Sequence, residues 1–490
     1  MNYLSIFLAL TPVVLLIILL GVLKISGHKS AFYTLITTLI IAVLGYHFSI
    51  AAVGLSILYG TLKAVFPIIL IIISAIYSYN VLVFTKKMEV LKFQFSTIST
   101  DKSIQVLLLT WGFGGLLEGM AGFGTAVAIP SAILIGLGYK PLFSALVSLL
   151  ANSVPTAFGA VGIPVKAIAI EIGQTNLEKL GSEVVLQLLP LMIIIPFIIV
   201  TLTDSSLKAL PKNIALSLTV GIVSIIVQYF SVIYIGIETP AILGSIASII
   251  VIVAWGKITS KKELNLHSEF KSNKEIINAW AIYGLILFFI IGTSPLFNTV
   301  RTFLQSISAT PIHFILEGTE KTIKIFWFTD GGVLLFLGTF LGGLLQGAKI
   351  KNLLSVFWET VLQLKKTYIT VISLIILSTI MDLSGMIAVL GLALAMATGA
   401  FLTGSDTSSN ILFGKLQANV AHQIGSEPSW FAAANTVGAT GGKIISPQSI
   451  AIATSACNQQ GNEGEIMKKA LPYALFYVII AGLMVYFFGN

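Results

Sequence analysis

The sequence is poor in charged residues. Asp, Glu, Lys and Arg together make up 10% of its 490 residues, whereas a soluble domain carries roughly 25%. Hydrophobic residues make up 56% of the chain, and the mean hydropathy is +0.98. Apolar runs recur from one end to the other, which excludes a set of ordinary soluble domains. We therefore predict an all-α polytopic membrane protein.

Cysteine and arginine are almost absent. Cys457 is the only cysteine, which excludes an intrachain disulfide and a thiolate metal cluster, and we interpret it as a small packing residue. The sequence indicates no metal and no cofactor. Arg301 is the only arginine, so the net charge of +8 comes from lysines in short clusters between apolar runs. Such clusters hold loops in the cytoplasm, and we expect no nucleic-acid partner.

Apolar runs near the length of a membrane helix, about 20 residues, recur along the chain. They cover 4–23, 31–48, 64–85, 184–203, 213–233, 237–256, 276–293, 328–347 and 470–489. We expect 4–23 to be a retained first span, because no basic segment precedes it and no cleavage pattern follows it. Glycine, proline and polar residues interrupt two further apolar regions, 104–170 and 367–455. With these regions included, we predict about 12 to 14 membrane segments, some of them broken.

The placement of lysine orients these segments. The lysine-rich loops at 24–29, 86–102, 208–212 and 257–275 are predicted to be cytoplasmic. The acidic stretch 171–183 and the N-terminus are predicted to lie outside. The stretches 86–102 and 350–366 mix apolar residues with lysine, which predicts helices on the membrane surface. We expect a multi-pass protein of the cytoplasmic membrane.

The two broken regions resemble each other. Residues 151–164 and 434–447 share Ala, Asn, Val, Gly and Pro in register at an offset of 434 − 151 = 283. The spans that follow the two copies are predicted to run in opposite directions. Inverted repeats with broken helices are typical of secondary transporters, and chance similarity is the alternative. The predicted organisation is a first repeat over 1–203 (broken at 104–170), a connecting helix pair and loop over 204–275, and a second repeat over 276–490 (broken at 367–455).

A carboxylate lies inside the first broken region. Glu118 stands in the glycine-rich stretch 112–130, and a carboxylate at bilayer depth must face a polar cavity or be protonated. Glycine lets the backbone turn, and the N–H groups at the start of a half-helix can then bind a carboxylate ligand. The alternative is close helix packing with Glu118 in a structural hydrogen bond.

The second broken region holds a polar block at 403–410 and a lysine. The hydroxyl and amide groups of the block suit a hydroxy acid, which offers both a hydroxyl and a carboxylate. Asp406 could take a proton or cap a restarting helix. Lys443 could neutralise an anion or pair with Asp406, and snorkelling to the surface is the alternative. The Gly-Gly-Lys at 441–443 lacks the other residues of a phosphate-binding loop.

Other conspicuous residues receive structural interpretations. The chain carries no His-Glu-x-x-His, no aspartate-rich diphosphate motif and no Ser-Lys or Ser-His constellation in register, so we do not expect an enzyme. Arg301 is interpreted as an outer surface residue, with an entry vestibule as the alternative, and His422 as a structural residue, with a proton relay as the alternative. Asp382 is interpreted as a helix cap and Lys166 as a structural partner or a snorkelling residue.

The motifs together resemble the L-lactate permease family. The resemblance is carried, in family order, by 117–125, 152–164, 402–410 with 413–417, and 442–449. Residues 205–330 carry no motif that we match. The chain departs from the family pattern at Ala126 and in the Gly-Ala-Thr-Gly-Gly of 438–442, and both departures bear on substrate preference.

The resemblance implies uptake of L-lactate, and of D-lactate or glycolate, together with a proton. It also implies an elevator-type architecture with re-entrant hairpins in the lipid bilayer. Whether the protein forms a homodimer is left open. Asp406 and Glu118 are the candidates for proton coupling. The residues expected to bind substrate are Gly122, Gly124, Thr125, Asn152, Thr407, Ser408, Ser409, Asn410, Lys443, Ser446, Gln448 and Ser449. A sodium-coupled carboxylate carrier, a membrane-embedded enzyme and a channel are the alternatives.

Overall fold

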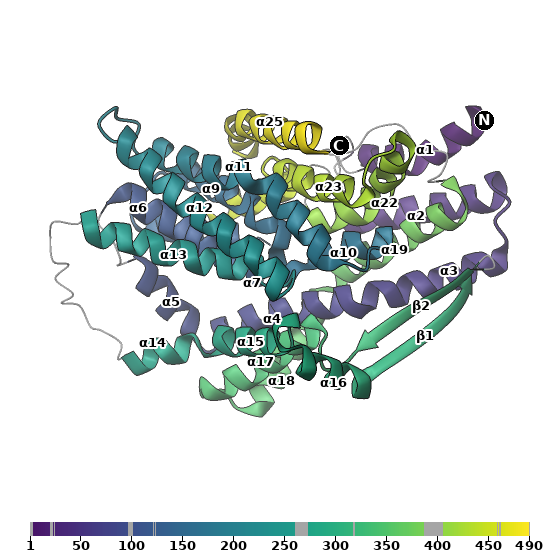
Figure 1. Ribbon diagram of the computed structural model, residues 1–490, viewed down its shortest axis with the longest axis horizontal. Coiled ribbons are helices and arrows are strands. Elements are labelled where there is room, and N and C mark those ends of the chain that lie inside the picture. The colour runs from purple at the N-terminus through teal and green to yellow at the C-terminus, as the bar shows by residue number, and fades with distance from the viewer. Residues whose placement is uncertain are drawn as a thin grey trace.

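The protein is a bundle of helices, many of them long enough to cross a membrane (Figure 1). The computed structural model describes residues 3–19, 23, 25–96, 101–120, 122, 124–259, 273–316, 319–386, 405–457, 459 and 462–489. Within these ranges, 8 helices are long and apolar enough to span a bilayer, and shorter apolar helices of 10–17 residues accompany them. The prediction of a mostly helical, polytopic membrane protein is confirmed.

The described helices form two sets along the chain, one before and one after residues 260–272. Up to Thr259 they are α1 (Tyr3–Ile17), α2 (Gly27–Gly45), α3 (Ile50–Lys63), η2 (Ala64–Ile69), α4 (Leu70–Phe84), α5 (Lys87–Ser96), α6 (Lys102–Leu107), η3 (Leu108–Gly114), α7 (Gly115–Met120), α8 (Thr125–Gly136), α9 (Pro141–Ser153), η4 (Pro155–Phe158), α10 (Gly159–Ile172), α11 (Leu177–Thr203), α12 (Leu210–Tyr234) and α13 (Pro240–Thr259). After it come α14 (Asn273–Ala279), α15 (Ala281–Gly292), η5 (Pro295–Phe297), α16 (Asn298–Ser308), α17 (Gly331–Leu345), α18 (Ile350–Gln363), α19 (Lys365–Leu383), α22 (Asp406–Ile424), α23 (Pro428–Lys443), α24 (Pro447–Ala456) and α25 (Glu463–Phe488).

Most of the clean apolar runs of the sequence coincide with helices. The run 276–293 is divided between α14 and α15, and residues 20–22 of the run 4–23 lie outside the described ranges. The run 64–85 is the second part of a longer helical segment, Ile50–Phe84, which kinks at Phe66. Pro67 explains the kink, because the residue before a proline is disfavoured in the helical region. The expected surface stretches 86–102 and 350–366 contain the helices α5 and α18.

Both broken regions contain interrupted helices. Between α7 and α8 the chain turns at Gly122 and Gly124, whose φ values of 61° and 88° fall where only glycine is free of a Cβ clash. In the second region α22 starts at Asp406, and residues 387–404 lie outside the described ranges. Helices α23 and α24 are separated by 444–446, in the segment that resembles the η4–α10 break.

The two broken regions interlock. Helix α10 packs against α22, and α24 packs against α8. In the same manner α11 packs against α23, and α25 packs against α9. Each half of the chain therefore provides the packing partner of the other half at the interruptions. This exchange brings residues about 250–330 positions apart in sequence into direct contact.

A β-hairpin is the exception to the all-α prediction. Strands β1 (Ala309–Leu316) and β2 (Thr319–Phe326) pair antiparallel, with Ala309 opposite Phe326. β-Branched residues and threonine recur along both strands and favour an extended backbone. The hairpin lies beside α3 at the right of Figure 1, far from the C-terminal end of α13. The charge pattern predicts the C-terminal end of α13 to face the cytoplasm. The hairpin therefore lies at the end of the molecule opposite to the predicted cytoplasmic end.

Candidate functional site

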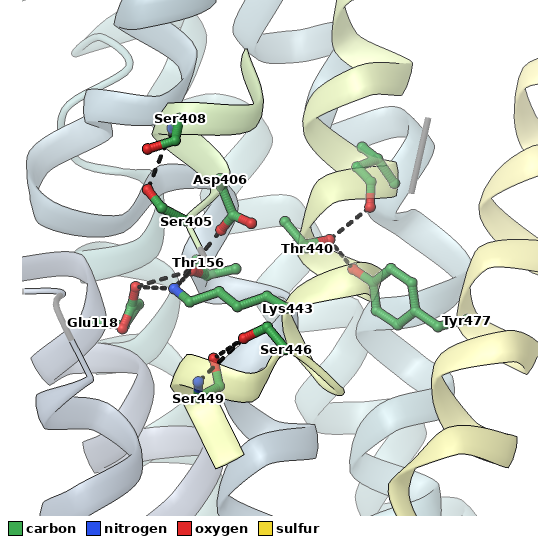
Figure 2. Close-up of polar contacts among 11 residues, drawn as sticks. Glu118, Thr156, Ser405, Asp406, Ser408, Thr440, Lys443, Ser446, Ser449 and Tyr477 are labelled. Carbon is green, nitrogen blue, oxygen red and sulfur yellow. Dashed lines mark hydrogen bonds and ion pairs between the residues drawn. The ribbon is translucent and has the colours of Figure 1, made fainter. Parts of the chain in front are cut away.

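Three charged side chains from distant parts of the chain meet at one point (Figure 2). Lys443, the last residue of α23, donates from Nζ to Glu118 Oε1 at 3.2 Å and lies 3.8 Å from Asp406 Oδ2. Thr156 in η4 donates to the same Glu118 oxygen at 2.9 Å, and Lys443 also hydrogen-bonds to the Thr156 hydroxyl. The expected pairing of Lys443 with Asp406 is present, but its contact with Glu118 is shorter.

This cluster is buried and incompletely hydrogen-bonded. Relative exposure is 2% for Glu118 and 3% for Asp406, while the Lys443 side chain is 14% exposed. Glu118 Oε2 and both Asp406 carboxylate oxygens lack a hydrogen-bond partner within the described residues. Leaving buried carboxylate oxygens without hydrogen bonds is costly. These oxygens are therefore positioned to receive a proton or a ligand.

A cavity of about 380 Å³ adjoins the cluster. This volume falls within the usual range of small-molecule sites, about 300–1,000 Å³. Helices α8, α22 and α24 all begin at its wall, where Gly124, Ser405 and Gln448 line it. The start of a helix presents free N–H groups and the positive end of the helix dipole, which attract anions. The cavity therefore has the size and the helix N-termini that suit a small anion.

The wall contributed by α10 has a strained backbone. Ala160 and Val161 have φ values of 43° and 59°, in the left-handed region that residues with a Cβ rarely adopt. Each such residue costs about 1–3 kcal/mol, and such strain tends to cluster at binding sites. Gly162 follows at φ 74°, and a Cβ there would lie 2.3 Å from the Ile237 carbonyl oxygen. The packing of α10 against the segment before α13 thus holds this turn in place.

Most residues expected from the sequence line the cavity, and a few do not. Those that line it are Glu118, Gly122, Gly124, Asn152, Asp406, Thr407, Ser408, Lys443, Gln448 and Ser449. The residues that do not line it are Thr125, Ser409, Asn410 and Ser446. Asn410 donates to the Pro164 carbonyl and to Thr436, each at 2.9 Å, so it joins α22 to α10 and α23. Ser446 accepts from the Ser449 backbone N–H at 3.1 Å and caps α24.

Two aspartates that the sequence suggested as helix caps, Asp406 and Asp382, do not cap a helix. The cap of α22 is Ser405, whose hydroxyl accepts from the Ser408 N–H, and Asp406 is the first residue of the helix. The carboxylate of Asp406 is thereby free of a capping role. Asp382 does not cap a helix end; it forms an ion pair with Lys415. Residues 403 and 404 of the polar block lie outside the described ranges.

The remaining structural interpretations are consistent with the contacts. Lys166 pairs with Asp330 at 3.4 Å, as a structural partner. His422 lies exposed in the last turn of α22, away from the cavity. Arg301 on α16 lines a small pocket with Glu178 and Glu238, apart from the charged cluster.

Sequence reasoning missed several lining residues. Thr156 is the most important, because it bridges Glu118 and Lys443. Its position in the repeated segment 151–164 was the available signal. The others are His28, Lys366, Thr367 and Thr370. Among the described residues, no group of three or more His, Cys, Asp or Glu side chains could hold a metal ion.

Comparison with known proteins identifies the family of the chain. Residues 5–489 match the family model for L-lactate permease. An L-lactate permease of Streptococcus iniae is 38% identical over 87% of this chain and 93% of its own length. The glycolate permease GlcA of Escherichia coli K12 is 30% identical over 98% of this chain and 95% of its own length. An L-lactate permease of Bacillus subtilis 168 is 29% identical over 99% and 95%. The chain belongs to the L-lactate permease family.

Proposed function

We propose that the protein imports L-lactate, and related 2-hydroxy monocarboxylates such as D-lactate and glycolate, by proton symport across the cell membrane. The observation that carries this proposal is the Lys443–Glu118–Asp406 cluster at the wall of the cavity. The names of the relatives, lactate and glycolate permeases, point to the same substrates. In the bound state the substrate carboxylate pairs with Lys443 and displaces it from Glu118.

The charge of the cluster supports a coupled proton. Glu118, Asp406 and Lys443 sum to −1 −1 +1 = −1 when all three are ionised. A lactate anion alone would raise the buried charge to −2, and like charges at low dielectric repel strongly. Lactate with one proton leaves the charge at −1. The loaded and empty carriers then present the same charge to the membrane during the conformational change.

Asp406 is the proposed proton site. Glu118 Oε1 accepts hydrogen bonds from Thr156 and Lys443, both of which favour the ionised form. Neither oxygen of Asp406 has a hydrogen-bond partner among the described residues, so protonating Asp406 breaks fewer hydrogen bonds than protonating Glu118. Glu118 is the alternative, and it would have to lose its contact with Lys443 to take the proton.

The hydroxyl groups of the cavity support a preference for 2-hydroxy acids. Thr156, Ser408 and Ser449 line it together with the amides of Asn152 and Gln448. The Asn152 Oδ1 is buried and has no hydrogen-bond partner in the described part of the chain, so it could accept from the substrate hydroxyl. A site with such unpaired acceptors rejects analogues that lack the hydroxyl. Propionate is therefore expected to be a poor substrate.

The architecture proposed for transport is a pair of inverted repeats, 1–203 and 276–490, joined by 204–275. The exchange of partners between α8–α11 and α22–α25 supports it, because a pseudo-two-fold relation requires reciprocal contacts. The moving body would comprise α6–α13 and α22–α25. It would slide against α4 and α14–α18, which lie below it in Figure 1. Rigid-body movement of this kind defines an elevator.

The cavity would open to the cytoplasm in this state. Its lining includes Gly27, His28, Lys366 and Thr367, in segments whose lysines predict a cytoplasmic position. The conformation is therefore interpreted as inward-facing, the state in which the substrate leaves after import.

The proposal is tested with purified protein in liposomes. Radiolabelled L-lactate should accumulate under an inward proton gradient without sodium, and a protonophore should abolish the accumulation. Asp406→Asn should lose accumulation and keep lactate–lactate exchange, while Asp204→Asn, in the α11–α12 loop, should behave as the parent protein. Accumulation that requires sodium would replace proton coupling by sodium coupling. Normal accumulation by Asp406→Asn would reject the proton site.

A further inference from the structure

A second cavity lies at the other end of the helices that line the central one. Its volume is about 410 Å³, and the hairpin strand β2 forms one wall. The opposite walls are the C-terminal parts of α10 and α19 and the middle of α22, with α3 closing the side. The transport mechanism proposed above does not use this space.

The same helices connect the two cavities. On α22, Asp406 lines the central cavity and Lys415 the hairpin cavity, and 415 − 406 = 9 residues span about 13 Å of helix. On α19, Thr370 and Thr379 have the same relation over 379 − 370 = 9 residues. The hairpin cavity therefore lies about 13 Å along these helices from the substrate site.

A closely packed layer separates the two spaces. A Cβ on Gly414 of α22 would lie 2.6 Å from Ile168 Cγ1 of α10, so the two helices are in direct contact there. Ile168 and Phe413 are buried, at 0% and 3% exposure. In the inward-facing state this layer closes the path between the cavities.

The hairpin cavity carries an excess of positive charge. Its lining includes four lysines, of which Lys63 pairs with Glu171 at 2.9 Å and Lys415 pairs with Asp382. The other two, Lys321 and Lys324 on β2, form no ion pair with any carboxylate of the described chain. The lining therefore sums to +2, and potentials of one sign in a cleft concentrate counter-ions.

We propose that the hairpin cavity is a second anion site, in which Lys321, on the half-buried face of β2 with Ile323, holds a small carboxylate on the outer side of the closed layer. Lys324 lies on the exposed face of the strand and adds positive charge there. This inference rests on the proposed import function for the identity of the anion. Apolar side chains such as Phe66 and Ile323 share the lining with the lysines, which suits a short organic acid. The site raises the local concentration of substrate and releases it to the central site when the layer opens. Binding of the anion in the hairpin cavity must be weak, because this site has to release its ligand to the central site.

Trp327 offers a reporter that does not depend on transport. Its ring lies 5.5 Å from that of Phe66, which lines the hairpin cavity. Iodide is an anion that quenches tryptophan fluorescence. The emission of Trp327 is the difference between the parent protein and Trp327→Phe. Iodide should quench this emission, and L-lactate should compete with iodide. Lys321→Gln/Lys324→Gln should lower the iodide quenching constant at least twofold, with quenching by neutral acrylamide unchanged. The matched control Lys349→Gln/Lys351→Gln removes two exposed lysines from the start of α18 and should have no effect.

The Lys443→Gln variant distinguishes anion binding in the hairpin cavity from substrate binding at the central site. It disables the central site, and competition between lactate and iodide at Trp327 should persist in this variant. Loss of competition in Lys443→Gln, or equal quenching in Lys321→Gln/Lys324→Gln and the parent, would overturn the proposal. If liposomes show no lactate transport but competition at Trp327 persists, the anion site stands and the import function fails.

Discussion

Gly159 and Glu118 are so close that a side chain at position 159 would displace the Glu118 carboxylate. A Cβ on Gly159 would lie 2.7 Å from Glu118 Oε1. That oxygen is the one that accepts hydrogen bonds from Thr156 and Lys443. The absence of a side chain at the first residue of α10 thus allows the charged cluster to form against the broken helix.

Gly159→Ala is expected to disrupt transport by displacing the Glu118 carboxylate. The backbone at Gly159, with φ −62°, is accessible to alanine, so the effect would come from the contact and not from backbone strain. We expect at least a tenfold loss of kcat/KM, which corresponds to about 1.4 kcal/mol. Gly136→Ala, where a Cβ would meet open space, is the matched control. Parent-like uptake by Gly159→Ala would show that Glu118 need not occupy this position.

Thr156→Val tests the bridge between Glu118 and Lys443. Valine has nearly the same shape but neither donates to Glu118 nor accepts from Lys443. A hydrogen bond to a charged group is worth about 1.5–3 kcal/mol, so uptake should fall about 10- to 100-fold. Thr156→Ser should retain most activity. Equal uptake by the valine and serine variants would exclude a role for the hydroxyl.

The two ends of α19 should be accessible from opposite sides of the membrane. Thr370 lines the central cavity and Leu383 the hairpin cavity. Because Cys457 is the only cysteine, Cys457→Ser provides a background for single reporters. An impermeant maleimide should label Thr370→Cys in inside-out vesicles and Leu383→Cys in intact cells. Labelling of both from one side would contradict the proposed orientation.

The pair of Lys63 and Glu171 is expected to stabilise the contact of α3 with α10. Their side chains are 12% and 3% exposed, and Ser378 donates to the second Glu171 oxygen at 2.9 Å. Lys63→Met leaves a buried carboxylate unpaired, which costs about 3–5 kcal/mol. Thermal unfolding in detergent should show a large drop in Tm for Lys63→Met. The double variant Lys63→Met/Glu171→Leu should recover most of it, and failure to recover would mean that the pair is not coupled.

The chemistry of the site was largely predictable from the sequence. Glu118, Asp406 and Lys443 stand out because charge is rare and costly in apolar segments. Gly122 and Gly124 stand out because dense glycine in such a segment marks a turn. The roles of Asn410 and Ser446 were not predictable, because a polar side chain in a broken region serves a ligand or the backbone with equal ease.

The sequence alone determined the membrane class, the family and the charged residues, since composition and local motifs carry that information without any knowledge of packing. Only the tertiary structure decided which charges meet. Lys443 contacts Glu118 across 325 positions, and Thr156 joins them from a third segment. The hairpin cavity likewise exists only because β2 folds back over α10, α19 and α22. Contacts of this range depend on how the helices pack, and no local pattern specifies that packing.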